Sequence, residues 1–176
     1  MALSERQLKR DEVALVWTID RTELIENVYH LIDGVLELRP ERYDMKGWPR
    51  GEPEKALPSL LDCFDEGGWF RGAFDETLLV GAAILENRFI GKDKDQLQLK
   101  FLHVSSKFRG KGLGRGLFEE ARAEARARGA RRMYVSATPS QNTIDFYIRS
   151  GCVLCREPDP ELYALEPEDI HLLCET

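Results

Sequence analysis

A run of alternating glycines past the middle of the chain has the clearest chemical meaning in this sequence. Gly110, Gly112, Gly114 and Gly116 follow the apolar run Leu97–Val104 and open an amphipathic stretch. A strand, a glycine-rich turn and a helix N-terminus, in that order, leave several backbone N–H groups unpaired and directed at one point. Such a point suits a phosphate-bearing ligand. We therefore expect this turn to bind the phosphates of a cofactor.

Two familiar phosphate-binding patterns do not fit these glycines. A Rossmann site needs G-x-G-x-x-G in the first β-α-β unit, followed about 20 residues later by an acidic residue. A P-loop needs G-x-x-x-x-G-K-[S/T], which the chain lacks. Nicotinamide- and ATP-dependent enzymes are therefore disfavoured. A purely structural turn is also a poor explanation, because it rarely needs four glycines beside Arg109, Lys111 and Arg115.

Two motifs together resemble a known family. Arg109-x-x-Gly112-x-Gly114 resembles the (Q/R)-x-x-G-x-(G/A) signature of the GNAT family of N-acetyltransferases, which bind acetyl-CoA. In that family a later helix carries N-x-x-x-F-Y-x-x-x-G, and this chain has the same pattern from Asn142 to Gly151. The resemblance is specific over residues 97–157, and the order of elements extends it over one domain, residues 1–176.

The resemblance implies that acetyl-CoA is the co-substrate. Backbone N–H groups of the turn would hold its pyrophosphate, since glycine allows a close approach and a positive φ. The main chain of residues 102–104 would pair with the pantetheine arm as an added strand does. Asn142 would contact the same arm or cap its helix. The expected cofactor-binding residues are Leu102, His103, Val104, Arg109, Gly110, Lys111, Gly112, Leu113, Gly114, Arg115, Asn142 and Phe146.

Acetyl transfer to an amine needs a neutral amine, an oriented thioester and a proton for the departing thiolate. Tyr147 matches the family's general acid, and the N–H of Val104 would polarise the thioester carbonyl. Some family members place a glutamate on the strand eleven residues before the signature arginine. That position here is Gln98, which cannot act as a base.

The base is therefore left open between Glu26, Tyr29 and His30 on an expected first helix, Glu86 on a hairpin, and a water molecule. His103 is expected on the strand face opposite Gln98, in a structural role. Because of Gln98 a second hypothesis also stays open, in which the chain is a non-catalytic module that binds or senses acetyl-CoA.

The resemblance places the acceptor pocket mainly in residues 17–53 and the C-terminal strands. The segment 52–76 carries seven acidic residues against Lys55 and Arg71, which favours a cationic amine, on a small molecule or a protein, as the acceptor. The expected lining residues are Trp17, Tyr29, Tyr43 and Trp48.

Composition is that of an ordinary soluble domain, with 43% hydrophobic and 32% charged residues. A net charge of −6 disfavours nucleic acid as a partner. No apolar run approaches the roughly 20 residues of a membrane helix, and no secretory signal is recognisable, so a cytoplasmic location is expected. Cys152 and Cys155 are expected on one strand, facing opposite ways, with no metal or redox role. A homodimer is a further possibility that the resemblance raises.

Hydrophobic patterning predicts the element order β-α-α-β-β-β-α-β-α-β-β. The fold class expected is α/β (α+β), a GNAT-like mixed, mostly antiparallel central sheet of about six to seven strands, flanked by about four helices and splayed at its central strands. The expected elements are a strand over 12–19, a helix from Asp20 to Leu36, a loop over 40–53, a short helix over 57–64, a hairpin of 69–74 and 78–88, a strand over 97–104, a helix over 113–128, a strand over 133–137, a helix around 144–148, and strands over 153–157 and 170–175, joined by an acidic loop.

Overall fold

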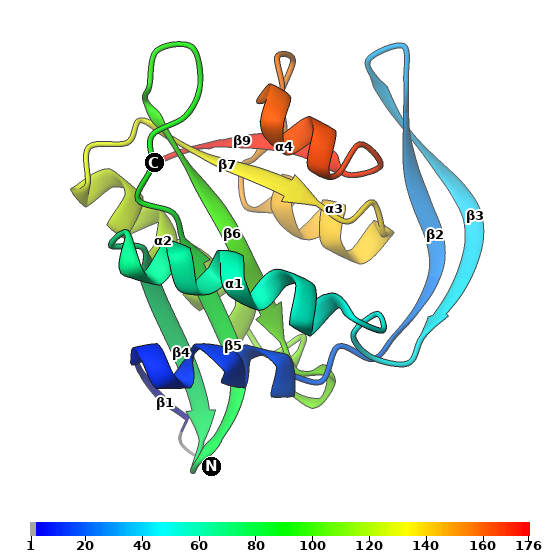
Figure 1. The fold of residues 1–176 in the computed structure, drawn as a ribbon. Helices are drawn as coiled ribbons and strands as arrows, with labels where there is room; N and C mark the ends of the chain where they lie inside the picture. Colours follow the sequence, from blue (N-terminus) through cyan, green and yellow to red (C-terminus); the bar gives the residue numbers. More distant parts are fainter. Residues whose placement is uncertain (1–2) are drawn as a thin grey trace.

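The computed structural model describes residues 3–176, which are organised around a seven-stranded sheet in the order β1-β4-β5-β6-β7-β9-β8 (Figure 1). Neighbouring strands are antiparallel except β6 and β7, which are parallel. The mixed, mostly antiparallel sheet expected from the sequence is thus confirmed. The strands are β1 (Ser4–Gln7), β4 (Trp69–Asp75), β5 (Leu78–Leu85), β6 (Gln96–Val104), β7 (Arg132–Ala137), β8 (Val153–Leu154) and β9 (Ile170–Glu175).

Helices cover both faces of this sheet. On one face, α1 (Glu52–Asp65) and the 3-10 helix η1 (Arg10–Thr18) form a core with β4 and β5, and both lie in front of the sheet in Figure 1. On the other face, α2 (Leu113–Ala127) and α3 (Gln141–Arg149) form a second core with β5, β6 and β7. None of the helices in residues 3–176 is long and apolar enough to cross a membrane.

The spacing of apolar residues in α2 explains which side of this helix packs against the sheet. Its buried positions recur at the helical period and form one apolar stripe: Leu113, Leu117, Phe118, Ala121 and Ala125. Gly129 follows the end of the helix with φ of 93°, as expected for a residue at C′.

The first helix predicted from the sequence is wrong. Residues 20–45 instead contain β2 (Glu23–Ile32) and β3 (Val35–Met45), which form a separate two-stranded sheet. The turn between them is Asp33-Gly34, with φ of 49° and 78°. Two successive positive φ angles make a type I′ turn, which matches the twist of a hairpin and favours Asp-Gly. The apolar residues at helical spacing are therefore strand residues that pair across this turn.

The predicted strand over 12–19 is also wrong, because this segment is the 3-10 helix η1. Val13 and Val16 are buried three residues apart, which fits three residues per turn. The Glu12 carboxylate accepts the Lys9 N–H at 2.8 Å and fixes the first turn. Asp20, expected to cap a helix, instead accepts the Thr22 N–H at 3.0 Å.

The central strands are splayed as expected. β6 and β7 pair only from Gln96 to Gln98, opposite Arg132 to Tyr134, and they have no further paired residues beyond that point. β7 remains fixed on its other edge because all six of its residues pair with β9. A gap therefore opens between two otherwise well-anchored strands.

A β-bulge in β6 changes which side chains face the two cores. Adjacent β5 residues pair with Leu99 and Phe101, which leaves Lys100 unpaired. Leu99 consequently packs on the α2 face and Phe101 on the α1 face, although they are two residues apart. His103 therefore shares a face with Gln98, and the expectation that they lie on opposite faces was wrong.

Cysteines 152 and 155 flank β8 instead of lying within it, so the expected strand-borne pair is wrong. Cys152 is bonded to Cys174 of β9 in a disulfide. Cys155 is a free, buried cysteine in a separate small cluster. The 22-residue separation between the bonded pair gave no signal in the sequence.

A pair of glycine substitutions, one against α1 and one on the exposed surface of α2, tests how tightly the chain packs at Gly68. A Cβ on Gly68 would lie 2.5 Å from Cys63 Sγ and 2.7 Å from the Cys63 carbonyl oxygen, which accepts the Gly68 N–H. Gly68→Ala should therefore lower the free energy of unfolding by about 1–3 kcal/mol in urea titrations. Gly116 has open space around it, so Gly116→Ala should raise stability by up to about 1 kcal/mol. Equal effects at both sites would contradict this packing.

Candidate active site

A cleft of about 1250 Å³ lies where β6 and β7 separate. Its walls come from both strands, the turn before α2, helix α3, the β2–β3 hairpin and the segment from α4 (Pro160–Leu165) to β9. Residues from both faces of the sheet line it, such as Phe146 on the α2 face and His103 on the α1 face. The cleft therefore connects the two sides of the sheet through the gap.

The turn before α2 presents a group of free backbone donors to this cleft. Within residues 3–176, none of the N–H groups from Gly110 to Arg115 is hydrogen-bonded, and the first bond of the helix joins Gly116 N–H to the Gly112 carbonyl at 2.9 Å. Gly110 and Gly112 have φ of 72° and 87°, which glycine adopts at little cost. These donors meet the positive end of the helix dipole, an arrangement that suits an anion.

The gap-facing edge of β6 carries further backbone groups. Ser105 N–H donates to the Val80 carbonyl of β5 at 2.8 Å. Because backbone groups alternate between the two edges of a strand, those of Leu102 and Val104 point to the opposite edge. That edge has no paired strand after Gln98. An extended amide-bearing ligand can therefore bond to this edge as an additional strand would.

Arg109 has a structural role that the sequence did not reveal. Its Nε donates to the Val104 carbonyl at 2.8 Å, and its two terminal nitrogens donate to the carbonyls of Thr22 and Asp20 at 3.0 and 3.2 Å. The guanidinium thereby fastens the end of β6 to the segment that precedes β2. It also occupies the carbonyl at the edge of the gap.

Most of the residues predicted to bind a cofactor do line the cleft. Leu113 is buried in the core instead, and Lys111 Nζ donates to the Lys107 carbonyl at 2.9 Å. Asn142 is not a helix cap, because Ser140 holds that position; its amide donates to Glu23 at 3.1 Å. The predicted residues that line the cleft are Leu102, His103, Val104, Arg109, Gly110, Gly112, Gly114, Arg115, Asn142, Phe146 and Tyr147.

Tyr147 lies in the cleft wall with only 7% of its surface exposed. Within residues 3–176 its hydroxyl has no hydrogen-bond partner. Burial, and then the charge of Asp169, raise the pKa of this phenol above its usual value. The group therefore keeps its proton at neutral pH and has a free donor in the cleft.

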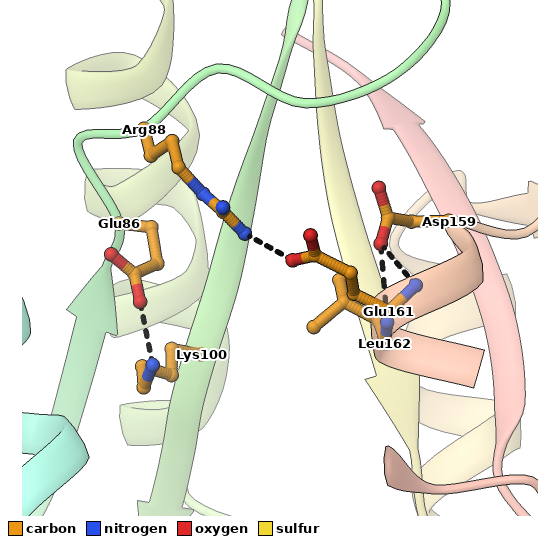
Figure 2. A network of polar contacts seen from close by, with 6 residues as sticks. All are labelled: Glu86, Arg88, Lys100, Asp159, Glu161 and Leu162. Atoms are coloured by element: carbon orange, nitrogen blue, oxygen red, sulfur yellow. Dashed lines mark hydrogen bonds and ion pairs between the residues drawn. The ribbon is translucent and has the colours of Figure 1, made fainter. Parts of the chain in front are cut away.

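The structure separates the base candidates named from the sequence. Tyr29 and His30 of β2 line the cleft, and His30 Nε2 contacts Glu41. Glu86 does not line it and is paired with Lys100 Nζ at 2.6 Å (Figure 2). Glu26 does not line it either.

His103 lies against an aromatic cluster, with ring centroids 4.8 Å from Trp48 and 4.7 Å from Phe101. Burial, together with the charges of Arg21 and Arg109, lowers the pKa of His103 to about 3. The imidazole is therefore neutral and a poor base. Of the aromatic residues expected to line the acceptor pocket, two do so, Tyr29 and Tyr43; the other two lie outside the lining, Trp17 and Trp48.

Helix α4, where a loop was expected, contributes to the wall of the cleft through Tyr163. Asp159 caps it by accepting the N–H groups of Glu161 and Leu162 at 3.0 and 3.1 Å (Figure 2). Arg88, in the loop after β5, pairs with Glu161 at 2.9 Å and ties the helix to the rest of the sheet. The sequence signal was present, because Asp159-Pro160 is a cap followed by proline at the first helical position.

The acidic segment 52–76, from which a cationic acceptor was inferred, lies away from the cleft. No residue of that segment lines the cleft. Glu52 instead pairs with Arg21 at 3.4 Å, and Asp65 with Arg10 at 2.7 Å. The acidic residues in the lining come from other elements: Glu23, Glu41, Glu168 and Asp169.

Comparison with known proteins agrees with this geometry. The model of the acetyltransferase (GNAT) family matches residues 33–152, more than half of the chain, and the chain therefore belongs to this acetyltransferase family. No curated protein sequence matches it.

Solved structures of low sequence identity share the fold. A nourseothricin acetyltransferase is 18% identical over 99% of both chains, with a TM-score of 0.72. A candidate streptothricin acetyltransferase of Bacillus anthracis str. Ames, in complex with acetyl coenzyme A, is 15% identical over 100% of this chain and 99% of that one, with a TM-score of 0.73. The PaiA N-acetyltransferase of Thermoplasma acidophilum, in complex with coenzyme A, is 15% identical over 100% of both chains, with a TM-score of 0.65.

The clamp formed by Arg109 predicts a loss of stability when it is removed. Arg109→Met deletes three hydrogen bonds from a charged donor and should lower the free energy of unfolding by about 2–3 kcal/mol in urea titrations without ligand. Arg115 is exposed and makes no hydrogen bond within residues 3–176, so Arg115→Met should change it by less than about 0.5 kcal/mol. An unchanged midpoint for Arg109→Met would contradict the structural role.

Proposed function

We propose that this protein is an acetyl-CoA-dependent N-acetyltransferase that transfers the acetyl group to a primary amine. The observation that carries the proposal is the run of unpaired N–H groups from Gly110 to Arg115, beside a sheet that is open at β6 and β7. A diphosphate needs free N–H donors, and an arm that carries amides needs a strand edge with free backbone groups. The complexes of structural neighbours with acetyl coenzyme A and coenzyme A support the same ligand.

The residues present fit this ligand in order along the cleft. The turn from Gly110 to Arg115 would hold the pyrophosphate, with Arg115 near its charge. The backbone groups of Leu102 on the free edge of β6 would bond to the pantetheine amides, and the Val104 N–H would face the thioester, since the Val104 carbonyl already accepts Arg109 Nε. Asn142 would contact the same arm after releasing Glu23, to which its amide donates in the structure.

The chain would have two chemical tasks: to stabilise charge on the thioester carbonyl and to supply a proton to the departing sulfur. Acetyl-CoA supplies an activated acetyl thioester, and the reaction forms a C–N bond while the C–S bond breaks with its electron pair on sulfur. Val104 N–H would stabilise the negative charge that develops on the carbonyl oxygen. Tyr147 would donate its phenolic proton to the departing sulfur, because its raised pKa keeps the phenol protonated and its hydroxyl has no hydrogen-bond partner within residues 3–176.

Cofactor binding is tested by placing a negative charge in the phosphate site. Gly114 has no positive φ, and a Cβ there meets Val104 at an ordinary 3.6 Å, so aspartate does not strain the fold. Near a helix N-terminus its charge even favours the free protein. Wild-type protein at 100 times the Kd of CoA should gain about 2.7 kcal/mol, a rise in Tm of about 5–10 °C. Gly114→Asp should keep its Tm without CoA and lose this rise.

The matched control is Gly116→Asp, which adds the same charge to the same helix but outside the cleft lining. It should retain most of the Tm rise. Loss of the rise in both variants would indicate a general charge effect. No rise in wild-type protein would contradict the proposed cofactor.

Catalysis is tested by Tyr147→Phe. Since the hydroxyl has no hydrogen-bond partner within residues 3–176, its removal should leave the fold intact and the Kd of CoA within twofold of wild type. Turnover should fall by about 100-fold. The measurement is CoA release with a panel of primary amines: 1,5-diaminopentane, lysine, benzylamine and aniline. Unchanged turnover would exclude Tyr147 as the acid.

The same panel distinguishes an enzyme from a binding module. A protein that binds CoA but acetylates none of the amines fits the non-catalytic hypothesis that Gln98 raised. Transfer to any of them identifies an acetyltransferase.

A further inference from the structure

Two carboxyl groups that the family motifs do not include lie at the end of β7, one of them in the wall of the cleft and the other exposed beside it. Asp169 lines the cleft, and Glu166 lies next to it in the segment between α4 and β9. Ser136 Oγ of β7 lies 3.1 Å from Asp169 Oδ2 and 3.5 Å from Glu166 Oε2. The three side chains therefore form one cluster at the end of β7, beside the gap.

This cluster has no cation of its own. Neither Glu166 nor Asp169 forms an ion pair with any residue from 3 to 176. The neighbouring Asp169 carboxyl, and then the partial desolvation of the Glu166 carboxyl itself, raise the pKa of Glu166 to about 7. Two adjacent carboxyl groups without a counter-ion hold a proton or attract a positively charged ligand.

A second observation, at Tyr147, points to a ligand site beside this pair. Tyr147 is 93% buried, lines the same cleft, and has a hydroxyl without a hydrogen-bond partner within residues 3–176. Asp169 is near enough for its charge to raise the pKa of this phenol. A phenol hydroxyl without a hydrogen-bond partner and a carboxylate without a cationic partner within residues 3–176 thus border the same cleft, which a polar ligand would fill.

The surrounding groups hold the pair in place without neutralising it. Tyr134 donates to His171 Nδ1 at 2.6 Å and accepts the Asp159 N–H at 3.1 Å. His171 Nε2 lies 3.3 Å from the Glu166 carbonyl oxygen, and burial lowers the pKa of this histidine. The titratable groups around the pair are His171 of β9, Tyr134 of β7, Tyr147 of α3, Asp159 and Tyr163 at α4, Cys155 after β8, and Glu168 in the same loop.

We propose that Asp169 and Glu166 bind the acceptor amine as its ammonium ion and remove its first proton, so that the preferred acceptors are cationic alkylamines. The inference rests on the proposed acetyltransferase function and extends it to the acceptor and the base. It also explains how the chain can dispense with a glutamate at Gln98.

The proton balance of the step is complete. The ammonium transfers one proton to the carboxylate pair and becomes a neutral amine. Its nitrogen forms the C–N bond as the C–S bond breaks, and the sulfur takes the Tyr147 proton. The second proton of the nitrogen returns to the Tyr147 oxygen, and the carboxylate pair releases its proton to water. The products are an amide, a thiol and one proton.

The test compares amines that differ in charge at neutral pH. Benzylamine and 1,5-diaminopentane are cations there, whereas aniline is neutral and needs no base before attack. Asp169→Asn should lower kcat/KM about 100-fold for the alkylamine that wild type uses best, and less than threefold for aniline. The Kd of CoA should stay within twofold of wild type. Glu175→Gln, an exposed charge at the end of β9, should leave both rates unchanged.

The pH profile tests the shared proton. In wild type, kcat/KM for the alkylamine should rise about tenfold from pH 6 to pH 8 and then level off, because the pair loses its proton near pH 7. In Glu166→Gln this rise should fall below twofold. His30→Gln, which alters the other candidate base in the cleft, should leave the rise in place.

Results that contradict the assigned base differ from results that contradict the proposed function. Equal losses for alkylamines and aniline in Asp169→Asn would overturn the proposal, as would a wild-type rate that climbs without a break to the pKa of the amine. A rise that survives Glu166→Gln but disappears in His30→Gln would assign the base to His30. Failure to bind CoA, or to acetylate any amine, would instead overturn the proposed function itself.

Discussion

The architecture of this protein depends on the early end of hydrogen bonding between β6 and β7. Three paired positions hold the strands together at one end, and from Leu99 onward their facing edges carry backbone groups that no neighbouring strand satisfies. Such an edge is costly inside a protein unless something else bonds to it. Arg109 takes one carbonyl, and Tyr29 N–H takes the Pro139 carbonyl beyond β7 at 2.8 Å. The remaining groups are available to a ligand, which is why the gap can be a site.

The two faces of the sheet supply different chemistry to this gap. The α2 face provides backbone donors at a helix N-terminus, which suit a phosphorylated ligand, and the buried phenol of Tyr147. The segment between α4 and β9 provides carboxylates at Asp169 and Glu166, which suit a cation. Because the cleft connects both faces, two ligands of opposite charge can meet at one place in the sheet. The charge of each ligand then directs it to its own side.

The sequence predicted well those elements whose local signals agree with the tertiary structure. From Gly67 onward, the hairpin, the strand before the turn, the helices α2 and α3 and strand β7 are confirmed, because periodicity, glycines and apolar runs all indicate them. Residues 12–45 were mispredicted, since apolar residues on both faces of a hairpin follow the spacing of a helical stripe, and the predicted helix ran through the Asp33-Gly34 turn. The bulge at Lys100 and the hydrogen bonds of Arg109 could not be predicted from the sequence, because both depend on contacts with distant segments of the chain.

The candidate site shows the same division between local and distant information. Backbone donors in a glycine turn are encoded by consecutive residues, so the phosphate side could be located from a motif. The carboxylate side joins Ser136 of β7 to Asp169, 33 residues later, and becomes a cluster only because β7 pairs with β9 along its whole length. Asp169 also raises the pKa of Tyr147 from a third element. An ammonium ion bound at Asp169 would offset that charge and make the phenol a stronger acid, so arrival of the acceptor would itself prepare Tyr147 for proton transfer.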